Sequence, residues 1–220
     1  MSDDFIRYPM LEIFYQRYLT SEHTADFIQS VSSCYSVGTL ERLARYGQCM
    51  SRRASVLAIG FLGDFSCNET LGRALVDDDR CVRMLADNGM RDIWPRQGTP
   101  AQQSGLRRLY RLNATDRTEE AIELASSLIF ENHELGEAWN QRAIAFCAEG
   151  DFLSAIEDCK ESLNCNRFHF PAAMGLAHCC LQMDDSMSAL EGFRLALRIN
   201  PDLEGVRNQI RHLERSMEDI

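Results

Sequence analysis

Along most of the chain, apolar residues recur at the three- and four-residue intervals of an amphipathic helix. Near the amino terminus, one such helical face is formed by Leu11, Phe14, Tyr15, Tyr18 and Leu19. The stretch TADFIQSV that follows predicts a second, short helix. Close to the carboxyl end, a further helical face is formed by Leu203, Val206, Ile210, Leu213 and Met217. This pattern predicts an all-α protein whose last helix caps the chain.

In the second half of the chain the helical pattern repeats. The segments EEAIELASSLI, LSAIEDCKESL and MSALEGFRLAL place Ala121, Ala155 and Ala189 at intervals of 34 residues. A Gly-Asp pair at 150–151 and an Asp-Asp pair at 184–185 separate the helices, and these residue types favour turns and helix N-caps. Each unit is therefore predicted to be a helical hairpin.

The period and its fixed positions resemble the tetratricopeptide repeat family over residues of about 102–217. The matching positions are Trp139, Phe146, Ala155, Leu176, Ala177, Ala189, Phe193, Ala196 and Pro201. The first unit, about 102–135, is degenerate, because Gly105 and Leu109 stand where the family has a tryptophan and a small residue. The resemblance implies a right-handed solenoid with about three units and a capping helix.

Small residues stand beside bulky ones in the unit that begins near Gly136. Ala143, Ala155 and Ser162 are small, whereas Trp139 and Phe146 are large. Helices of a hairpin that also pack on the next hairpin must approach closely, and short side chains permit this. We expect the small residues to mark the closest contacts between helices.

The first hundred residues show a looser repeat. The segments 52–64 and 82–94 each read as a helix that opens with an arginine, Arg53 and Arg83, and LGRALVDDDR precedes the second. This order resembles a HEAT repeat over residues of about 38–94. The resemblance implies that the aspartates at 77–79 and the two arginines form a structural ladder.

The segment PRQGTP, at 95–100, has two prolines, a glycine and no apolar content. We therefore expect a boundary there, with a helical HEAT-like region at 1–98 and a tetratricopeptide repeat domain at 99–220.

Charge and composition limit the classes of partner that we expect. Of the formal charge of −10, residues 1–98 hold −2 and residues 99–220 hold −8, with 20 acidic and 12 basic residues in the latter. Nucleic acid is therefore an unexpected partner. No run of about 18 apolar residues and no signal-like segment is present, which predicts a cytoplasmic protein without membrane insertion. The nine cysteines are then expected to be reduced thiols.

The sequence shows no pattern typical of a catalytic, cofactor or metal site. GFLGD is too short for a phosphate-binding loop, and the five histidines and nine cysteines form no His-Glu-x-x-His or Cys-x-x-Cys motif. The run 178–180, His-Cys-Cys, points in divergent directions on a helix and cannot converge on one ion. We therefore predict no enzyme activity, no cofactor and no metal.

The family resemblance implies a concave groove lined by the first helices of the hairpins, which binds a peptide or a partner helix. The implied groove residues are Leu106, Tyr110, Asn140, Ile144, Cys147, Met174, His178, Asn208 and His212. A clamp for a terminal carboxylate is not expected, because its positions hold Leu106, Tyr110, Gln141, Pro171 and Gly175. The expected function is that of a protein-binding scaffold or adaptor.

Three alternatives stay open. In the first alternative, the protein is a regulatory or accessory subunit of an enzyme, or its first hundred residues carry an activity with Trp94, Arg53 and Arg83 as candidate site residues. In the second, the protein self-associates through the groove or through helices near the amino terminus. In the third, the aliphatic groove residues Leu106, Ile144 and Met174 do not bind a ligand, because the amino-terminal region or a second subunit covers them.

Overall fold

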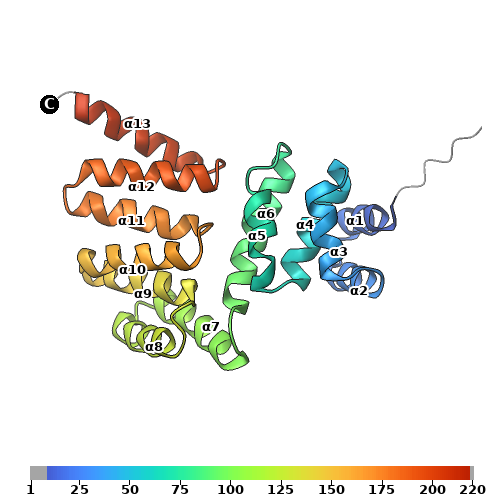
Figure 1. Ribbon diagram of the computed structural model, residues 1–220, viewed down its shortest axis with the longest axis horizontal. Coiled ribbons are helices and arrows are strands. Elements are labelled where there is room, and N and C mark those ends of the chain that lie inside the picture. The colour runs from blue at the N-terminus through green and yellow to red at the C-terminus, as the bar shows by residue number, and fades with distance from the viewer. Residues whose placement is uncertain (1–8, 219–220) are drawn as a thin grey trace, which may run out of the picture. The chain divides into compact units, whose positions relative to one another are not determined.

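A computed structural model describes residues 9–218, and these residues form an all-α protein (Figure 1). The chain divides into two compact units, with the border between Ile93 and Trp94. The first unit contains α1 (Met10–Ser21), α2 (Thr24–Cys34), α3 (Val37–Tyr46), α4 (Cys49–Leu62), the short 3-10 helix η1 (Phe65–Cys67), α5 (Asn68–Ala74) and α6 (Arg80–Ile93). The second contains η2 (Trp94–Arg96), α7 (Pro100–Ala114), α8 (Thr118–Glu131), α9 (Gly136–Glu149), α10 (Phe152–Cys165), α11 (Phe170–Gln182), α12 (Ser186–Ile199) and α13 (Glu204–Glu218).

Helices pack mainly on their neighbours in the sequence. In the second unit every helix from α7 to α13 packs on the next one, so the helices lie in chain order (Figure 1). In the first unit α1 packs on α2, α3 on α4 and α5 on α6, and α4 also contacts α1, α2 and α6. The prediction of an all-α chain is confirmed, and the sequential packing is consistent with a helical repeat array.

The second unit repeats its backbone geometry every 34 residues. α8, α10 and α12 each have 14 residues and begin at 118, 152 and 186. α9, α11 and α13 begin at 136, 170 and 204. In the turns, Asp116, Gly150 and Asp184 have φ values of 53°, 81° and 58°. Glycine adopts this left-handed conformation freely, whereas the two aspartates hold it at a small cost.

The predicted turn and cap residues at 150–151 and 184–185 are confirmed. Asp151 caps α10 by accepting a hydrogen bond from the Ser154 N–H at 3.1 Å. Asp185 caps α12 in the same way, from the Ser188 N–H at 3.0 Å. Each cap satisfies one of the free N–H groups in the first turn of its helix.

A second periodic cap was not predicted. Asn132, Asn166 and Asn200 follow the last residues of α8, α10 and α12. The side-chain oxygen of each accepts a hydrogen bond from the backbone N–H two residues further on, at 3.0–3.1 Å. Asparagine forms such local turns readily. These residues therefore set the direction in which the chain leaves one hairpin for the next.

Small side chains lie at buried contacts between helices, as predicted. Ala121, Ala155 and Ala189 have no exposed surface, and each is the fourth residue of its helix. Ala155 belongs to a buried cluster with Ala143 of α9 and with Cys179 of α11. Ala155 therefore lies where three helices, α9, α10 and α11, come together.

We expect Ala155→Leu to lower the free energy of unfolding by about 1–3 kcal/mol, because the larger side chain overpacks this cluster. Urea denaturation of the two proteins measures the difference. Ala148→Leu makes the same change at an exposed position of α9 and should stay within about 0.5 kcal/mol of the parent protein. Equal stability of Ala155→Leu and the parent would contradict the contact.

In the first unit, the aspartate-rich turn before α6 holds two arginines of α4. The Arg52 guanidinium donates to both carboxylate oxygens of Asp77 at 2.8 Å. Arg53 donates in the same way to Asp79, at 2.8 and 2.6 Å. Arg83 donates to the backbone carbonyl oxygens at 77 and 78. The predicted contact between Arg53 and the aspartates is confirmed, and Arg52 adds a second pair.

The segment predicted as a boundary packs on the second unit. Trp94 is 2% exposed, and its ring stacks on that of His169 with the centroids 4.3 Å apart. The Gln97 side-chain amide donates to the Glu134 carbonyl oxygen at 2.7 Å. Thr99, the predicted first residue of the second domain, is the N-cap of α7. The compact unit therefore begins at Trp94, because this side chain is part of its core.

Candidate functional site

Three helices of the second unit, α7, α9 and α11, form one layer. α7 contacts α9, and α9 contacts α11, in addition to the even-numbered helices between them. Within residues 9–218, α8 and α10 make no contact of that extent, nor do α10 and α12. A stack of hairpins whose first helices are closer together than the second helices curves toward the first helices. α7, α9 and α11 therefore line the inner side of the curve.

A pocket of about 330 Å³ opens between α9 and α11 and reaches α10. It is lined by Asn140, Ala143, Ile144 and Cys147 of α9, Cys159 of α10, and Pro171, Gly175, His178 and Cys179 of α11. A Cβ atom at Gly175 would stand 3.1 Å from the Cys159 Sγ. The glycine therefore gives the pocket its access to α10.

The pocket wall is mostly apolar, with polar groups at two places. Ile144 is 45% exposed and offers an apolar side chain at the rim. The Asn140 amide donates to Glu137 Oε1 at 3.3 Å, which fixes its orientation. The His178 ring lies edge-on to Phe193, with the centroids 5.1 Å apart. Burial lowers the pKa of His178, so its ring is neutral at pH 7 and offers both a donor and an acceptor.

Two thiols of the pocket are chemically inert. Burial raises the pKa of Cys179 to about 12 and raises the pKa of Cys159 far above its usual range. A cysteine is a nucleophile or a metal ligand as the thiolate, which neither residue forms near pH 7. Both side chains therefore serve as small apolar surface.

A buried polar network lies around Glu137, next to Asn140 of the pocket. Glu137 Oε2 accepts a hydrogen bond from His169 Nε2 at 2.9 Å, and Oε1 accepts one from Gln141 Nε2 at 2.7 Å. The Ala172 N–H donates to His169 Nδ1 at 3.1 Å, which places the ring proton on Nε2. Burial by itself would raise the pKa of Glu137, but the hydrogen bond and electrostatic attraction of His169, with hydrogen bonds from Gln141 and Tyr110, outweigh it and lower that pKa. The carboxylate thus joins α7, α9 and the start of α11.

Four of the nine predicted groove residues come together in the pocket: Asn140, Ile144, Cys147 and His178. They come from two different helices of the inner layer, α9 and α11. The structure therefore brings together the central part of the predicted set.

The other five residues lie elsewhere. Tyr110 is half-buried and bonds to Glu137, and Met174 is half-buried against the cluster around Phe193. Asn208 and His212 are exposed on α13, outside the pocket. Leu106 is fully buried in the core of α7, α8 and α9, and does not line a groove. α7 packs on η2 as well as on α8 and α9, which leaves this side chain without access to solvent.

Four residues of the pocket were not predicted from the sequence: Cys159, Pro171, Gly175 and Cys179. One signal was available at Gly175, because a glycine inside a helix costs about 1 kcal/mol relative to alanine. A glycine inside a helix therefore indicates a close approach or an open space on that face. The thiols gave no such signal, since buried cysteines are common in helical cores.

Within residues 9–218, no group of three histidine, cysteine or acidic side chains is arranged to hold a metal ion. None of the helices in this part of the chain has the length and apolar character needed to cross a bilayer. Compared with known protein families and with curated proteins, the chain shows no match.

Proposed function

We propose that the second unit is a binding module of the tetratricopeptide repeat type and that the protein acts as a non-enzymatic scaffold or adaptor. The ligand is an extended peptide or a helix of another protein, held against α9 and α11. The observation that carries the proposal is the pocket of about 330 Å³ on the inner layer of helices. The 34-residue recurrence of helix starts, left-handed turn residues and buried alanines supports the choice of repeat type.

The chemistry of the pocket suits one apolar side chain of the ligand. Its volume lies near the lower end of the range for small-ligand sites, which fits a single large side chain. Ile144 and the two buried thiols supply apolar contact. The Asn140 amide and the neutral His178 ring offer donors and acceptors, which suit the backbone of a bound peptide.

The charge of this unit favours a basic ligand. Residues 99–220 hold 20 acidic and 12 basic side chains. An acidic surface attracts a cationic partner over several ångströms, and this attraction falls as salt screens it. We therefore propose a ligand in which lysine or arginine residues flank an apolar anchor, and whose association slows as the salt concentration rises.

The alternatives from the sequence are less well supported. An activity in the first hundred residues would use Trp94, Arg53 and Arg83, but Trp94 is buried against His169, and Arg53 binds Asp79. Self-association and a role as an accessory subunit stay predictions. Light scattering at two protein concentrations distinguishes a monomer from a self-associating protein.

A random library of 12-residue peptides displayed on phage tests the proposal. We expect the immobilised full chain to enrich peptides with one large apolar residue between basic residues. Ile144→Asn should weaken the best synthetic peptide about tenfold or more in a fluorescence titration, because the apolar contact at the pocket rim is replaced by an amide that must be desolvated.

The matched control is Phe130→Asn, the same kind of change at a side chain of α8 that is 84% exposed and outside the pocket. It should leave the affinity unchanged. If no peptide is enriched, or if both variants bind as the parent does, the pocket is not the binding site and the proposal is wrong.

A further inference from the structure

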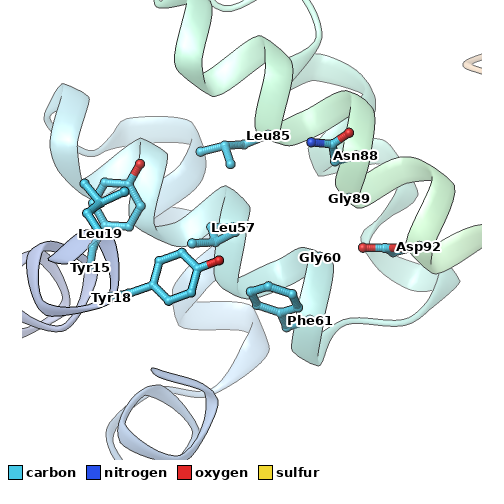
Figure 2. Close-up of a pocket in the computed structure, with 10 residues that line it drawn as sticks. All are labelled: Tyr15, Tyr18, Leu19, Leu57, Gly60, Phe61, Leu85, Asn88, Gly89 and Asp92. Carbon is cyan, nitrogen blue, oxygen red and sulfur yellow. The ribbon is translucent and has the colours of Figure 1, made fainter. Parts of the chain in front are cut away.

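A second pocket lies within the first unit, where helices α1, α4 and α6 adjoin (Figure 2). Its volume is about 310 Å³. It is lined by Tyr15, Tyr18 and Leu19 of α1, Leu57, Gly60 and Phe61 of α4, and Leu85, Asn88, Gly89 and Asp92 of α6. Three of these side chains are aromatic, one is a carboxylate, and none is a lysine or arginine.

Two glycines give this pocket its space. A Cβ atom at Gly60 would stand 3.1 Å from the Gly89 Cα, so the backbones of α4 and α6 pass close to each other there. Both residues are buried, and both line the pocket. Larger residues at these positions would push the helices apart or fill the space between their side chains.

Tyr18 and Phe61, which form the aromatic wall of the pocket, are held in place by packing on the buried Phe27. Tyr18 packs on Phe27 with the ring centroids 5.2 Å apart, and Phe27 lies edge-on to Phe61 at 6.4 Å. Phe27 itself is 3% exposed. Tyr18 and Phe61 lie on the same side of the pocket, opposite Leu85 and Asn88 (Figure 2). Their orientation is thus set by core packing before any ligand enters.

The carboxylate of Asp92 has no partner in the described chain. It is exposed, and within residues 9–218 it makes no hydrogen bond or ion pair. The adjacent cation, Arg91, is bound by Asp87 at 2.7 Å. The Asp92 side chain points across the pocket toward Gly60 (Figure 2). An unpaired negative charge therefore stands at one end of an aromatic wall.

We propose that this pocket binds a compact organic cation, namely an alkylated ammonium group. Aromatic faces attract such a cation through their electron-rich π systems, and the carboxylate adds a direct charge interaction. The carbon atoms of the ligand gain apolar contact with Tyr18, Phe61 and Leu57. A metal ion fits poorly, because a single carboxylate and one amide do not supply the oxygen ligands that hard cations need. The proposal is independent of the groove between α9 and α11.

Choline and its neutral analogue 3,3-dimethyl-1-butanol test the proposal, because they differ only in the charged nitrogen. In titrations of the full chain followed by NMR, we expect choline to bind about fivefold or more tightly than the alcohol. Asp92→Asn should remove most of that difference. The amide keeps the size of the side chain, and the site is exposed, so the fold is retained.

Asp78→Asn is the matched control, since it removes the same charge from an exposed aspartate outside the pocket. It should leave both affinities unchanged. Capped trimethyllysine is the third ligand. If the natural ligand is a methylated lysine of a partner protein, this compound should bind more tightly than choline; if it is a free small molecule, it should not.

Equal binding of choline and the alcohol would overturn the proposal, as would the absence of binding by all three ligands. An unchanged preference for choline in Asp92→Asn would also overturn the role of the carboxylate. Either of the first two results would mean that the recess is only an apolar gap between three helices.

Discussion

Glu137→Gln is expected to lower the free energy of unfolding by about 3 kcal/mol, although the two side chains have almost the same size. Donors converge on both oxygens of the Glu137 carboxylate: His169 Nε2 at 2.9 Å, and the Gln141 and Asn140 amides at 2.7 and 3.3 Å. A carboxylate accepts all of these hydrogen bonds, whereas an amide has one oxygen and an NH2 group. In the variant, the NH2 group must therefore face a donor, or the Gln141 amide must turn over and give up the hydrogen bond that its oxygen accepts from Asn113 at 2.8 Å.

The His169 ring cannot relieve this conflict by moving its proton. Its Nδ1 accepts the hydrogen bond from the Ala172 N–H at 3.1 Å, which is part of the cap of α11. If the proton moved to Nδ1, the cap would be lost and another buried donor would be left without an acceptor. Urea denaturation at pH 7 measures the loss.

The same network predicts how the loss depends on pH. The pKa of Glu137 in the folded protein lies below the ordinary value of 4.5. The stability from its charged form is therefore fully present above about pH 4.5 and is lost as the pH falls through the folded pKa. Glu137→Gln lacks this contribution at every pH. The difference between parent and variant should shrink as the pH is lowered from 7 to about 3.

Glu123→Gln is the control, because it makes the same change at an exposed residue of α8. Its stability should stay within about 0.5 kcal/mol of the parent protein at pH 7. A parent-like stability of Glu137→Gln at pH 7 would contradict the network. A loss that stays constant down to pH 3 would contradict the charged state of Glu137.

The repeat was predictable because it depends on local requirements that recur with the period. Ala155 has its equivalents at 121 and 189, and all three are fully buried at the same position of a helix. The Asn132, Asn166 and Asn200 caps recur at the same interval and were equally visible in the sequence. They were not predicted, because helical periodicity concerns side chains on helix faces and these residues stand outside the helices.

The contacts that occur once in the chain could not be predicted in this way. Trp94 stacks on His169, and His169 bonds to Glu137, although no repeat relates the three residues. Their pairing depends on how η2 packs on the second unit, which the family resemblance does not specify. The same packing buries Leu106, the predicted groove residue that lies in the core.

In the pocket between α9 and α11, a residue was predictable from the sequence only where its place on a single helix face is enough to bring it into the pocket. Asn140, Ile144 and Cys147 follow from the face that α9 turns toward α11. Gly175 and Cys159 line the same pocket because two further helices approach that face, which is a property of the tertiary packing. In the first unit, Tyr18, Phe61 and Asp92 likewise come from three helices. The sequence pattern places each residue on its own helix but does not show that the three meet.

Gly192→Leu is expected to lower the free energy of unfolding by about 3 kcal/mol, at the upper end of the range for overpacked sites. A Cβ atom at Gly192 would stand 2.9 Å from the Ala177 Cβ and 3.1 Å from its Cα and N atoms. Two of these three atoms belong to the backbone of α11, so no flexible side chain can move aside. α11 itself is held by α10 and α9 on its other sides.

Thermal and urea denaturation measure this effect, and Gly205→Leu is the matched control. No atom lies within 4 Å of the Cβ position at Gly205, which is exposed in the first turn of α13. Leucine is the better helix former there, so the control should be as stable as the parent protein or slightly more stable. Because both variants replace a helical glycine by leucine, the difference between them reports mainly on the contact of α12 with α11. Equal stability of the two variants would show that these helices do not approach through Gly192 and Ala177, and the close packing of this hairpin would then need another cause.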